Sequence, residues 1–272
     1  MAQEQLFDLQ AMLQKYFSPC GTCPQCGGTL WSHIGKGRQK GINSPGACPS
    51  CGYKEPHKST NKPKTSSDFT AASRKRTAVD YYLARSVFAN DLVMGKDLGN
   101  FKVETKPQKE LRTMADGVIN QLLQGKVVHS YIGGAPGVGK THISNGIAIA
   151  YQQRSGYKAK VMFVDWRELL DRQKRGMDTP DVRAKNQATI DAWATADLVV
   201  LDDLGSERNS EYNLDMCDQF WRVREDKSVV TTSNVSIDEI KKKYGDRTYS
   251  RLASHAEGNS IIVAGMSDQR NY

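Results

Sequence analysis

A glycine-rich segment at residues 131–142, which reads YIGGAPGVGKTH, carries the most specific chemical pattern in the sequence. Gly134 and Gly139 are separated by four residues and followed by Lys140 and Thr141. Glycine permits positive φ angles and leaves no side chain in the way, so consecutive backbone N–H groups can surround a polyanion. The pattern predicts a loop that binds ATP or ADP, in which the lysine contacts the β- and γ-phosphates and the threonine ligates Mg²⁺. The expected nucleotide-binding residues are Gly134, Ala135, Pro136, Gly137, Val138, Gly139, Lys140, Thr141 and His142.

Polar residues also follow two apolar runs that read as buried strands. Asp202 and Asp203 come directly after residues 198–201, and Asn234 comes shortly after residues 229–232. The carboxyl ends of parallel strands meet at one sheet edge, so we expect these side chains beside the phosphate loop. Asp202 is expected to hold Mg²⁺ and Asp203 to orient or deprotonate the attacking water. Asn234 is expected to contact the γ-phosphate or that water, with an ordinary turn residue as the alternative.

A basic pair near the C-terminus is a candidate for action on a neighbouring subunit. Arg247 and Arg251 are four residues apart, on one face of a helix that a capping box at Ser236 and Glu239 is expected to open. A guanidinium presented to a neighbour's nucleotide would stabilise the charge of the transition state. The alternative for Arg251 is a surface arginine in a salt bridge.

Five of the six cysteines fall between residues 20 and 51. The sequences CPQCG at 23–27 and CPSCG at 48–52 repeat one turn, and each turn directs two thiolates at a common point. Two such turns predict a closed Zn²⁺ site with a folding role and no catalysis. The predicted ligands are Cys23, Cys26, Cys48 and Cys51. The alternative ligands are Cys20, His33 and His57.

Short apolar runs alternate with helical stretches through the rest of the chain. The expected strands are residues 127–132, 161–164, 198–201, 229–232 and 261–263. Alternation of this kind implies an α/β fold, with a five-stranded parallel sheet and helices on both faces. The expected organisation is a terminal helix and zinc ribbon at 1–57, a linker and connecting helix at 58–97, and an ATPase domain at 98–272. Within the linker, residues 57–73 read as flexible and residues 74–87 as a helix.

The composition favours a cytoplasmic protein with an anionic partner. The 272 residues carry a formal net charge of +8, and the basic excess is concentrated near the cysteine module. No apolar run approaches membrane-spanning length, and the N-terminus does not resemble a signal peptide. We therefore expect no membrane partner, although a solvated basic surface without a specific ligand is an alternative for the charge.

The motifs together resemble the AAA+ ATPases of the DnaC/DnaI helicase-loader family, which also includes IstB-type transposition helpers. The resemblance runs from about Leu98 to the C-terminus and rests on GxPGxGKT, DD, TSN, GDRxxSRL and SDQR. It implies an AAA+ P-loop ATPase preceded by a zinc-ribbon domain, with Asn234 as sensor 1, Arg251 as the arginine finger and Arg270 as the sensor 2 arginine. Asp203 stands where many AAA+ proteins carry Glu, which implies slow, switch-like hydrolysis. The chain also leaves little room for a helical lid.

The same resemblance implies a function in DNA replication. Such a loader binds a DnaB-type hexameric replicative helicase and single-stranded DNA, and delivers the helicase to DNA during replication initiation. Self-association through the arginine finger, on the helicase, and a bacterial or phage-encoded, nucleoid-associated protein are also implied. The candidate DNA contacts are Arg172, Lys174 and Arg175, for which a solvated helix face is the alternative. The competing functions are an IstB-like helper acting on double-stranded DNA with a transposase, a P-loop kinase, and a binding module that never hydrolyses nucleotide.

Overall fold

The computed structural model describes residues 17–33, 45–55 and 66–264. The chain divides into two compact units, residues 1–65 and residues 66–272. Across the described ranges, no helix is both long enough and apolar enough to cross a membrane. The predicted N-terminal helix, His57 and Arg270 lie outside the described residues.

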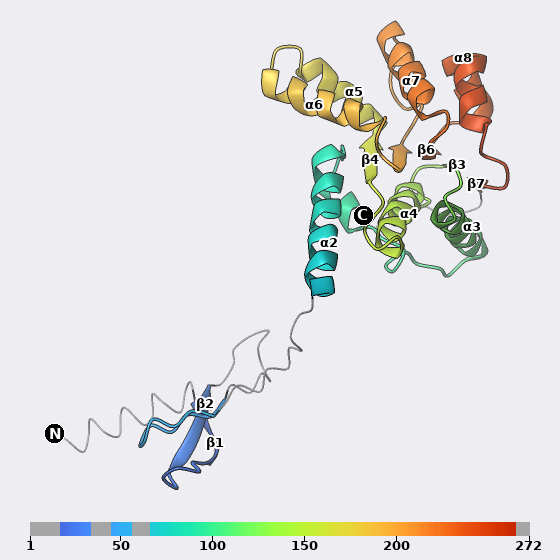
Figure 1. Ribbon diagram of the computed structural model, residues 1–272. Helices are drawn as coiled ribbons and strands as arrows, with labels where there is room; N and C mark the ends of the chain where they lie inside the picture. The colour runs from blue at the N-terminus through green and yellow to red at the C-terminus, as the bar shows by residue number, and fades with distance from the viewer. Residues whose placement is uncertain (1–16, 34–44, 56–65, 265–272) are drawn as a thin grey trace. The chain divides into compact units, whose positions relative to one another are not determined.

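Five parallel strands form the sheet of the larger unit, in the order β4, β5, β6, β3, β7 (Figure 1). The strands are β3 (His129–Gly134), β4 (Val161–Asp165), β5 (Leu198–Asp202), β6 (Ser228–Ser233) and β7 (Ser260–Val263). Their side chains alternate between two buried clusters, which explains why the runs are apolar without interruption. The predicted α/β fold with a five-stranded parallel sheet is confirmed.

Helices cover both faces of this sheet. The cluster on one face includes residues of α3 (Lys106–Leu123) and α4 (Lys140–Arg154). The cluster on the other face is formed with α5 (Trp166–Arg175), α6 (Pro180–Ala192), α7 (Glu211–Arg224) and α8 (Ile237–Ala253). Figure 1 shows the two layers on opposite sides of the strands. The predicted capping box of Ser236 and Glu239 opens α8, and Gly245, with φ 81°, interrupts this helix.

The larger unit begins earlier than the sequence indicated. The sequence predicted a flexible segment that ends at residue 73 and a helix that begins at residue 74. One continuous helix, α2 (Ser66–Arg85), spans that boundary instead. Its buried residues are Ala78 and Tyr82, whereas Leu83 is half exposed. After α2, Val87 forms a parallel bridge with Val164 of the edge strand β4. The larger compact unit therefore starts at Ser66, because α2 and Val87 complete one edge of the sheet.

The smaller unit is organised by its two cysteine turns. Strands β1 (Phe17–Thr22) and β2 (Thr29–His33) pair antiparallel and flank the first turn. Both turns have the same backbone pattern: the N–H of Gly27 donates to Cys23 O, and the N–H of Gly52 donates to Cys48 O, each at 3.0 Å. The two glycines have φ angles of 71° and 77°, which explains their place in the repeated motif.

Candidate nucleotide and zinc sites

The phosphate loop leaves the carboxyl end of β3 and opens α4. Gly134, Gly137 and Gly139 have φ angles of 146°, 81° and 88°, so the loop depends on conformations that side chains disfavour. A Cβ atom at Gly134 would lie only 2.6 Å from the carbonyl oxygen of Val263, so glycine is also required there for space. The loop therefore has the backbone that a phosphate needs, at the N-terminus of a 15-residue helix.

The ammonium group of Lys140 is held by three oxygen atoms at the mouth of this loop. Nζ donates to the carbonyl oxygens of Gly134 and Ala135, at 2.8 Å each, and to Oδ1 of Asn234 at 2.6 Å. The amide group of Asn234 in turn donates to the carboxylate of Asp203. The structure thus joins the predicted lysine, the predicted polar sensor and the second acid in one hydrogen-bonded chain.

Asp202 lies at the end of β5 and is almost completely buried, with 3% of its surface exposed. Thr141 Oγ1 donates to one carboxylate oxygen at 2.9 Å, and Thr232 Oγ1 donates to the other at 2.7 Å. Burial raises the pKa of Asp202 to about 6, against the opposing effect of these two hydrogen bonds. A hydroxyl group beside a carboxylate is a suitable oxygen pair for Mg²⁺, which prefers such ligands.

Asp165 is a further acid of this site that the sequence motifs did not reveal. It pairs in register with Asp202 on the neighbouring strand and lines the same cleft. Its carboxylate caps α5 by accepting from the N–H of Glu168 at 2.8 Å, and burial raises its pKa. The sequence did contain a signal for this acid. Residues 161–165, VMFVD, are an apolar run that ends in an aspartate, as are residues 199–203, VVLDD.

One wall of the cleft comes from the segment before α3, including η2 (Asp91–Gly95). Asn145 of α4 donates to the carbonyl oxygens of Val93 and Lys96, at 2.8 Å each. His142 Nε2 lies 2.9 Å from the carbonyl oxygen of Asp97. These contacts fix the wall to the helix that follows the phosphate loop. His142, predicted as a nucleotide contact, also lines the cleft.

The cleft has a volume of about 630 Å³, which is within the range of ligand-binding sites in proteins. It is lined by Lys140, Thr141, Asp202, Asp203 and Asn234 together. Glycine-rich backbone, the two lysines Lys96 and Lys140, and clustered oxygen ligands fit a nucleotide triphosphate with its divalent ion. The arrangement can bind phosphate, hold Mg²⁺ and orient a water molecule.

Arg251 makes its contacts away from these cleft residues. Its Nε donates to Glu225 at 3.1 Å and its terminal nitrogen donates to Asp218 at 2.7 Å. Only 15% of its side chain is exposed. The contacts orient the guanidinium within its own subunit, whereas Arg247, four residues earlier on α8, is exposed.

The three cations proposed for DNA on α5 are engaged with acids. Arg172 and Arg175 both bind Oε1 of Glu168, at 2.9 and 2.7 Å. Lys174 lies 4.0 Å from Asp171. Glu168 therefore offsets much of the positive charge that the sequence suggested for this face.

The four predicted zinc ligands meet at one point. The Sγ atoms of Cys23, Cys26, Cys48 and Cys51 all lie within 4.8 Å of one another, and the pairs Cys23–Cys51 and Cys26–Cys48 are 3.6 and 3.5 Å apart. A tetrahedral site with Zn–S bonds of 2.3 Å requires sulfur atoms about 3.8 Å apart. The backbone N–H groups of Cys51 and Ser50 lower the pKa of Cys48 to about 6, against the opposing effect of burial. Burial and the neighbouring thiols raise the pKa of Cys51, against a hydrogen bond from the backbone of Tyr53, so without metal the negative charge of the cluster lies on Cys48.

The cluster excludes the alternative ligands that fall within the described residues. Cys20 and His33 are not members of the four-sulfur group. The ring of His33 instead packs edge-on against Phe17, with centroids 5.5 Å apart. Leu30 and Tyr53 pack in one cluster with the buried residues Cys23 and Cys48, so a small apolar core supports the site.

A model of the family described as IstB-like ATP binding protein matches residues 75–257. The chain belongs to this family. The matched range covers the phosphate loop, both acids, Asn234 and Arg251. It establishes an AAA+ ATP-binding domain, consistent with ATPase activity. Comparison with curated protein sequences gave no match.

Solved structures with the same fold as this IstB-like protein include the DnaC helicase loader, with 22% identity and a TM-score of 0.53 over 64% of this chain and 99% of that chain. DnaI is 19% identical, with a TM-score of 0.51 over 65% of this chain and 95% of that chain. AMPPCP-bound DnaA from Aquifex aeolicus is 16% identical, with a TM-score of 0.52 over 67% of this chain and 53% of that chain. These similarities confirm the AAA+ fold.

Removal of a single sulfur from the cluster should abolish tight zinc binding. We expect about one zinc ion per wild-type chain and far less in Cys48→Ser, because a tetrahedral site then lacks one of its ligands. The measurement is elemental analysis of purified protein by inductively coupled plasma mass spectrometry. Cys20→Ser is the matched control and should retain its zinc. Equal zinc content in the two variants would contradict the assignment.

Stability without nucleotide should depend on pH through Asp202. The pKa is about 6 in the folded protein and roughly 4 in the unfolded chain, so the folded state binds the extra proton between these values. The contribution of this group to stability is therefore present at low pH and is lost as pH rises through about 6. Asp202→Asn should stabilise the protein at pH 8, by at most about 3 kcal/mol, and much less at pH 5.

Urea denaturation at both pH values, without nucleotide or Mg²⁺, measures this difference. Asp203→Asn is the control, because Asp203 is only partly buried and asparagine tolerates its φ of 60°. A stability difference between Asp202→Asn and the wild type that is the same at pH 5 and pH 8 would show that Asp202 does not titrate in this range.

Proposed function

We propose that this protein is an ATP-dependent helicase loader. It binds a DnaB-type hexameric replicative helicase and single-stranded DNA, and delivers the helicase to DNA during replication initiation. The observation that carries the proposal is the series of hydrogen bonds from Lys140 through Asn234 to Asp203 in an IstB-like ATPase unit. A separate unit with the four cysteines, residues 1–65, precedes it and is called the cysteine unit. In this arrangement the ATPase unit supplies a switch and the cysteine unit supplies a second surface for a partner protein.

The chemistry assigns a role to each cleft residue. The backbone of residues 134–139 surrounds the phosphates, while Lys140 leaves its carbonyl partners to contact the β- and γ-phosphates. Thr141 and Asp202 hold Mg²⁺, which neutralises charge on the phosphates when bound. Asp203 orients the attacking water, and Asn234 reports the presence of the γ-phosphate because it touches both Lys140 and Asp203. The side chain of Asp203 is short and accepts a hydrogen bond from the amide group of Asn234, which supports slow, switch-like hydrolysis.

Zinc supports the fold of the smaller unit in this proposal. Four closed thiolate ligands leave no open coordination position, so the ion stabilises the two cysteine turns and performs no chemistry. The cysteine unit is the part of the chain that engages the helicase. The sensor 2 role of Arg270 and an association of the protein with the nucleoid also belong to this proposal.

The first test is complex formation with a purified DnaB-type helicase. Mass photometry with ATP and Mg²⁺ should show a defined complex with the wild type. Cys48→Ser should lose most of that complex but keep ATP binding, whereas Cys20→Ser should keep both. Absence of any complex at micromolar concentration, with or without ATP, would refute the loader. Filaments on double-stranded DNA without helicase affinity would support the transposition helper instead.

The second test asks whether Arg251 acts on a neighbouring subunit. Arg251→Ala should reduce ATP turnover on the assembled protein by roughly 10³-fold, the lower end of the effect of an arginine finger. An equal mixture of Arg251→Ala and Lys140→Ala should recover activity, because some interfaces then combine an intact loop with an intact arginine. Arg247→Ala is the control.

Contacts with Asp218 and Glu225 offer a competing explanation for Arg251. If the arginine only ties α8 to α7, Arg251→Ala will lower the melting temperature and its mixture with Lys140→Ala will remain inactive. That outcome would remove the action in trans from the proposal and leave ATP binding in place.

A further inference from the structure

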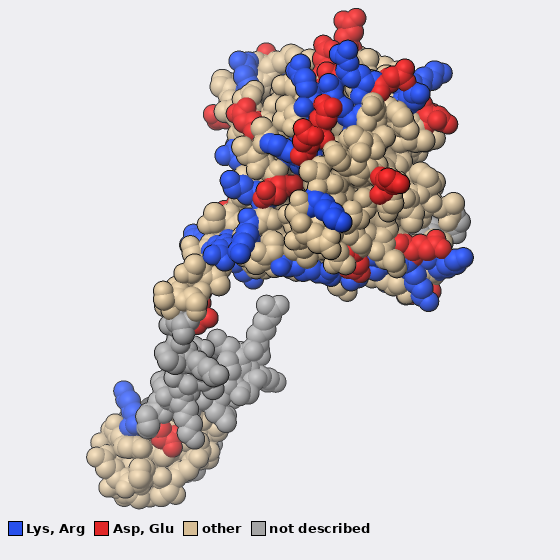
Figure 2. Space-filling view, turned by 45° about the vertical axis from the view of Figure 1, so that its right-hand side comes forward, with Lys and Arg blue, Asp and Glu red and all other residues tan. Residues whose placement is uncertain are grey.

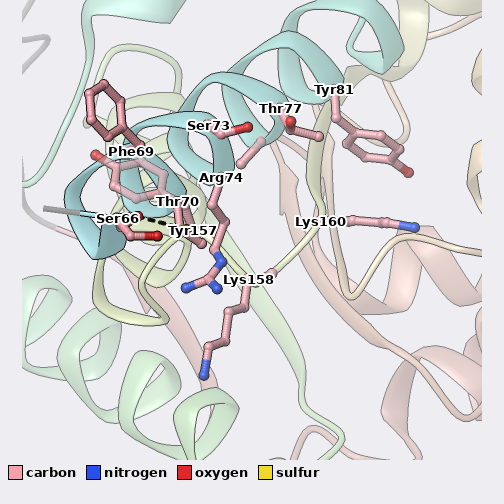
Figure 3. Close-up of a pocket in the computed structure, with 12 residues that line it drawn as sticks. Ser66, Phe69, Thr70, Ser73, Arg74, Thr77, Tyr81, Tyr157, Lys158 and Lys160 are labelled. Carbon is pink, nitrogen blue, oxygen red and sulfur yellow. Dashed lines mark hydrogen bonds between the residues drawn. The ribbon is translucent and has the colours of Figure 1, made fainter.

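A second cavity of the ATPase unit lies away from the nucleotide cleft. It has a volume of about 1040 Å³ and is formed between α2 and the segment 157–160 that leads into β4 (Figure 3). We call it the α2 groove and define it by Phe69, Arg74, Tyr81, Tyr157, Lys158 and Lys160. None of the residues that line the nucleotide cleft also lines this groove.

The α2 groove combines cations, aromatic rings and hydroxyl groups, and no acid lines it. Arg74 and Lys158 are exposed and form no ion pair with a described residue, and Figure 3 shows their charged ends on the same side of the helix. Asp197, at the same edge, accepts a hydrogen bond from the backbone N–H of Lys160 at 2.7 Å. On the face drawn in Figure 2, by contrast, basic and acidic side chains are interspersed over most of the ATPase unit.

Aromatic rings in the groove are placed for stacking. Phe69 is 62% exposed, which is a large exposure for a phenylalanine on a helix. Tyr157 stands on a turn with the left-handed φ of 59°, held by a hydrogen bond from its N–H to Gln152 O at 2.8 Å. Lysine ammonium groups already lie over two rings, Lys75 over Tyr157 at 5.6 Å and Lys160 over Tyr81 at 5.9 Å.

We propose that the α2 groove binds single-stranded nucleic acid. Arg74, Lys158 and Lys160 contact phosphates, and bases stack on Phe69 and Tyr157. A positively charged groove with aromatic rings along it is the arrangement that binds single strands without sequence preference. This inference deepens the proposed function, because it names the surface on which the loader holds single-stranded DNA.

Two observations favour this occupant over others. The preceding residues of the same chain, 56–65, contain three lysines and no acid, so their charge does not complement the groove. The α5 cations are bound to Glu168 and Asp171, whereas Arg74 and Lys158 have no such partner among the described residues. A single strand matches both features of the groove, since every nucleotide offers one phosphate and one ring.

Fluorescence anisotropy with a labelled 20-nucleotide oligothymidylate, with and without ATP and Mg²⁺, tests the inference. Arg74→Ala/Lys158→Ala should weaken binding at least tenfold at low salt. It should also reduce the slope of log K against log salt by about 1.4, because two phosphate contacts are lost. Phe69→Ala should weaken binding roughly fivefold or more, the effect of one lost stacking contact. All variants should keep ATP binding and the wild-type melting temperature.

The matched control is Lys109→Ala/Lys126→Ala, which removes the same charge from exposed lysines in and just after α3. Its affinity should stay within twofold of the wild type. Photocross-linking with a bromodeoxyuridine-substituted strand should place the cross-link in the peptides that contain Phe69 or Tyr157. Cross-links confined to α5 would overturn the assignment.

The remaining outcomes separate failure of this inference from failure of the proposed function. Wild-type binding that the groove variants do not change would overturn the inference and leave the loader intact. Competition by double-stranded DNA that is as strong as competition by unlabelled single-stranded DNA would also overturn it. So would binding of poly-glutamate by a protein that does not bind the oligonucleotide. The helicase complex is measured without the oligonucleotide, so its loss would count against the loader alone.

Discussion

The amide group of Asn234 connects the two halves of the nucleotide site. Its oxygen accepts from Lys140, and its nitrogen donates to Asp203. Both contacts exist only because β6 lies between β5 and β3, so the residue after β6 reaches the loop on one side and the acid on the other. A movement of Lys140 therefore changes the hydrogen bonding of Asp203 through the side chain of Asn234 alone. Strand order is the constraint on which this coupling depends.

The sequence predicted the strands because burial on both faces leaves an unbroken apolar run, as at residues 198–201. It did not predict α6, whose buried residues are Asn186, Thr189 and Ala192, so its helical period is not marked by apolar side chains. The start of α2 was missed for a related reason. Its first turns, from Ser66, are exposed and polar and resemble a linker in composition. Hydrophobic periodicity reports a helix only where the helix is covered.

Within the site, the residues that follow a motif or a strand end were predictable, as Thr141, Asp202 and Asn234 show. The cleft wall held by Asn145 was not, because its contacts join segments about fifty residues apart. The charges on α5 show the opposite error. The sequence displayed Arg172 and Arg175 but not the geometry by which Glu168 binds both. Sequence gives the charge of a side chain, whereas its availability is a tertiary property.

The bridge between Val87 and β4 has a consequence for the boundary of the catalytic core. Val87 donates to Phe163 O at 2.7 Å and accepts from the N–H of Asp165 at 2.9 Å, so it occupies the hydrogen-bonding edge of the outermost strand. A shortened domain starting at Leu98 would leave these backbone groups bare, and bare strand edges invite pairing between molecules. It would also remove the hydrogen bond between Val87 and the backbone N–H of Asp165, an acid of the nucleotide cleft. A segment outside the conventional motifs thus protects solubility and shapes the catalytic wall at the same time.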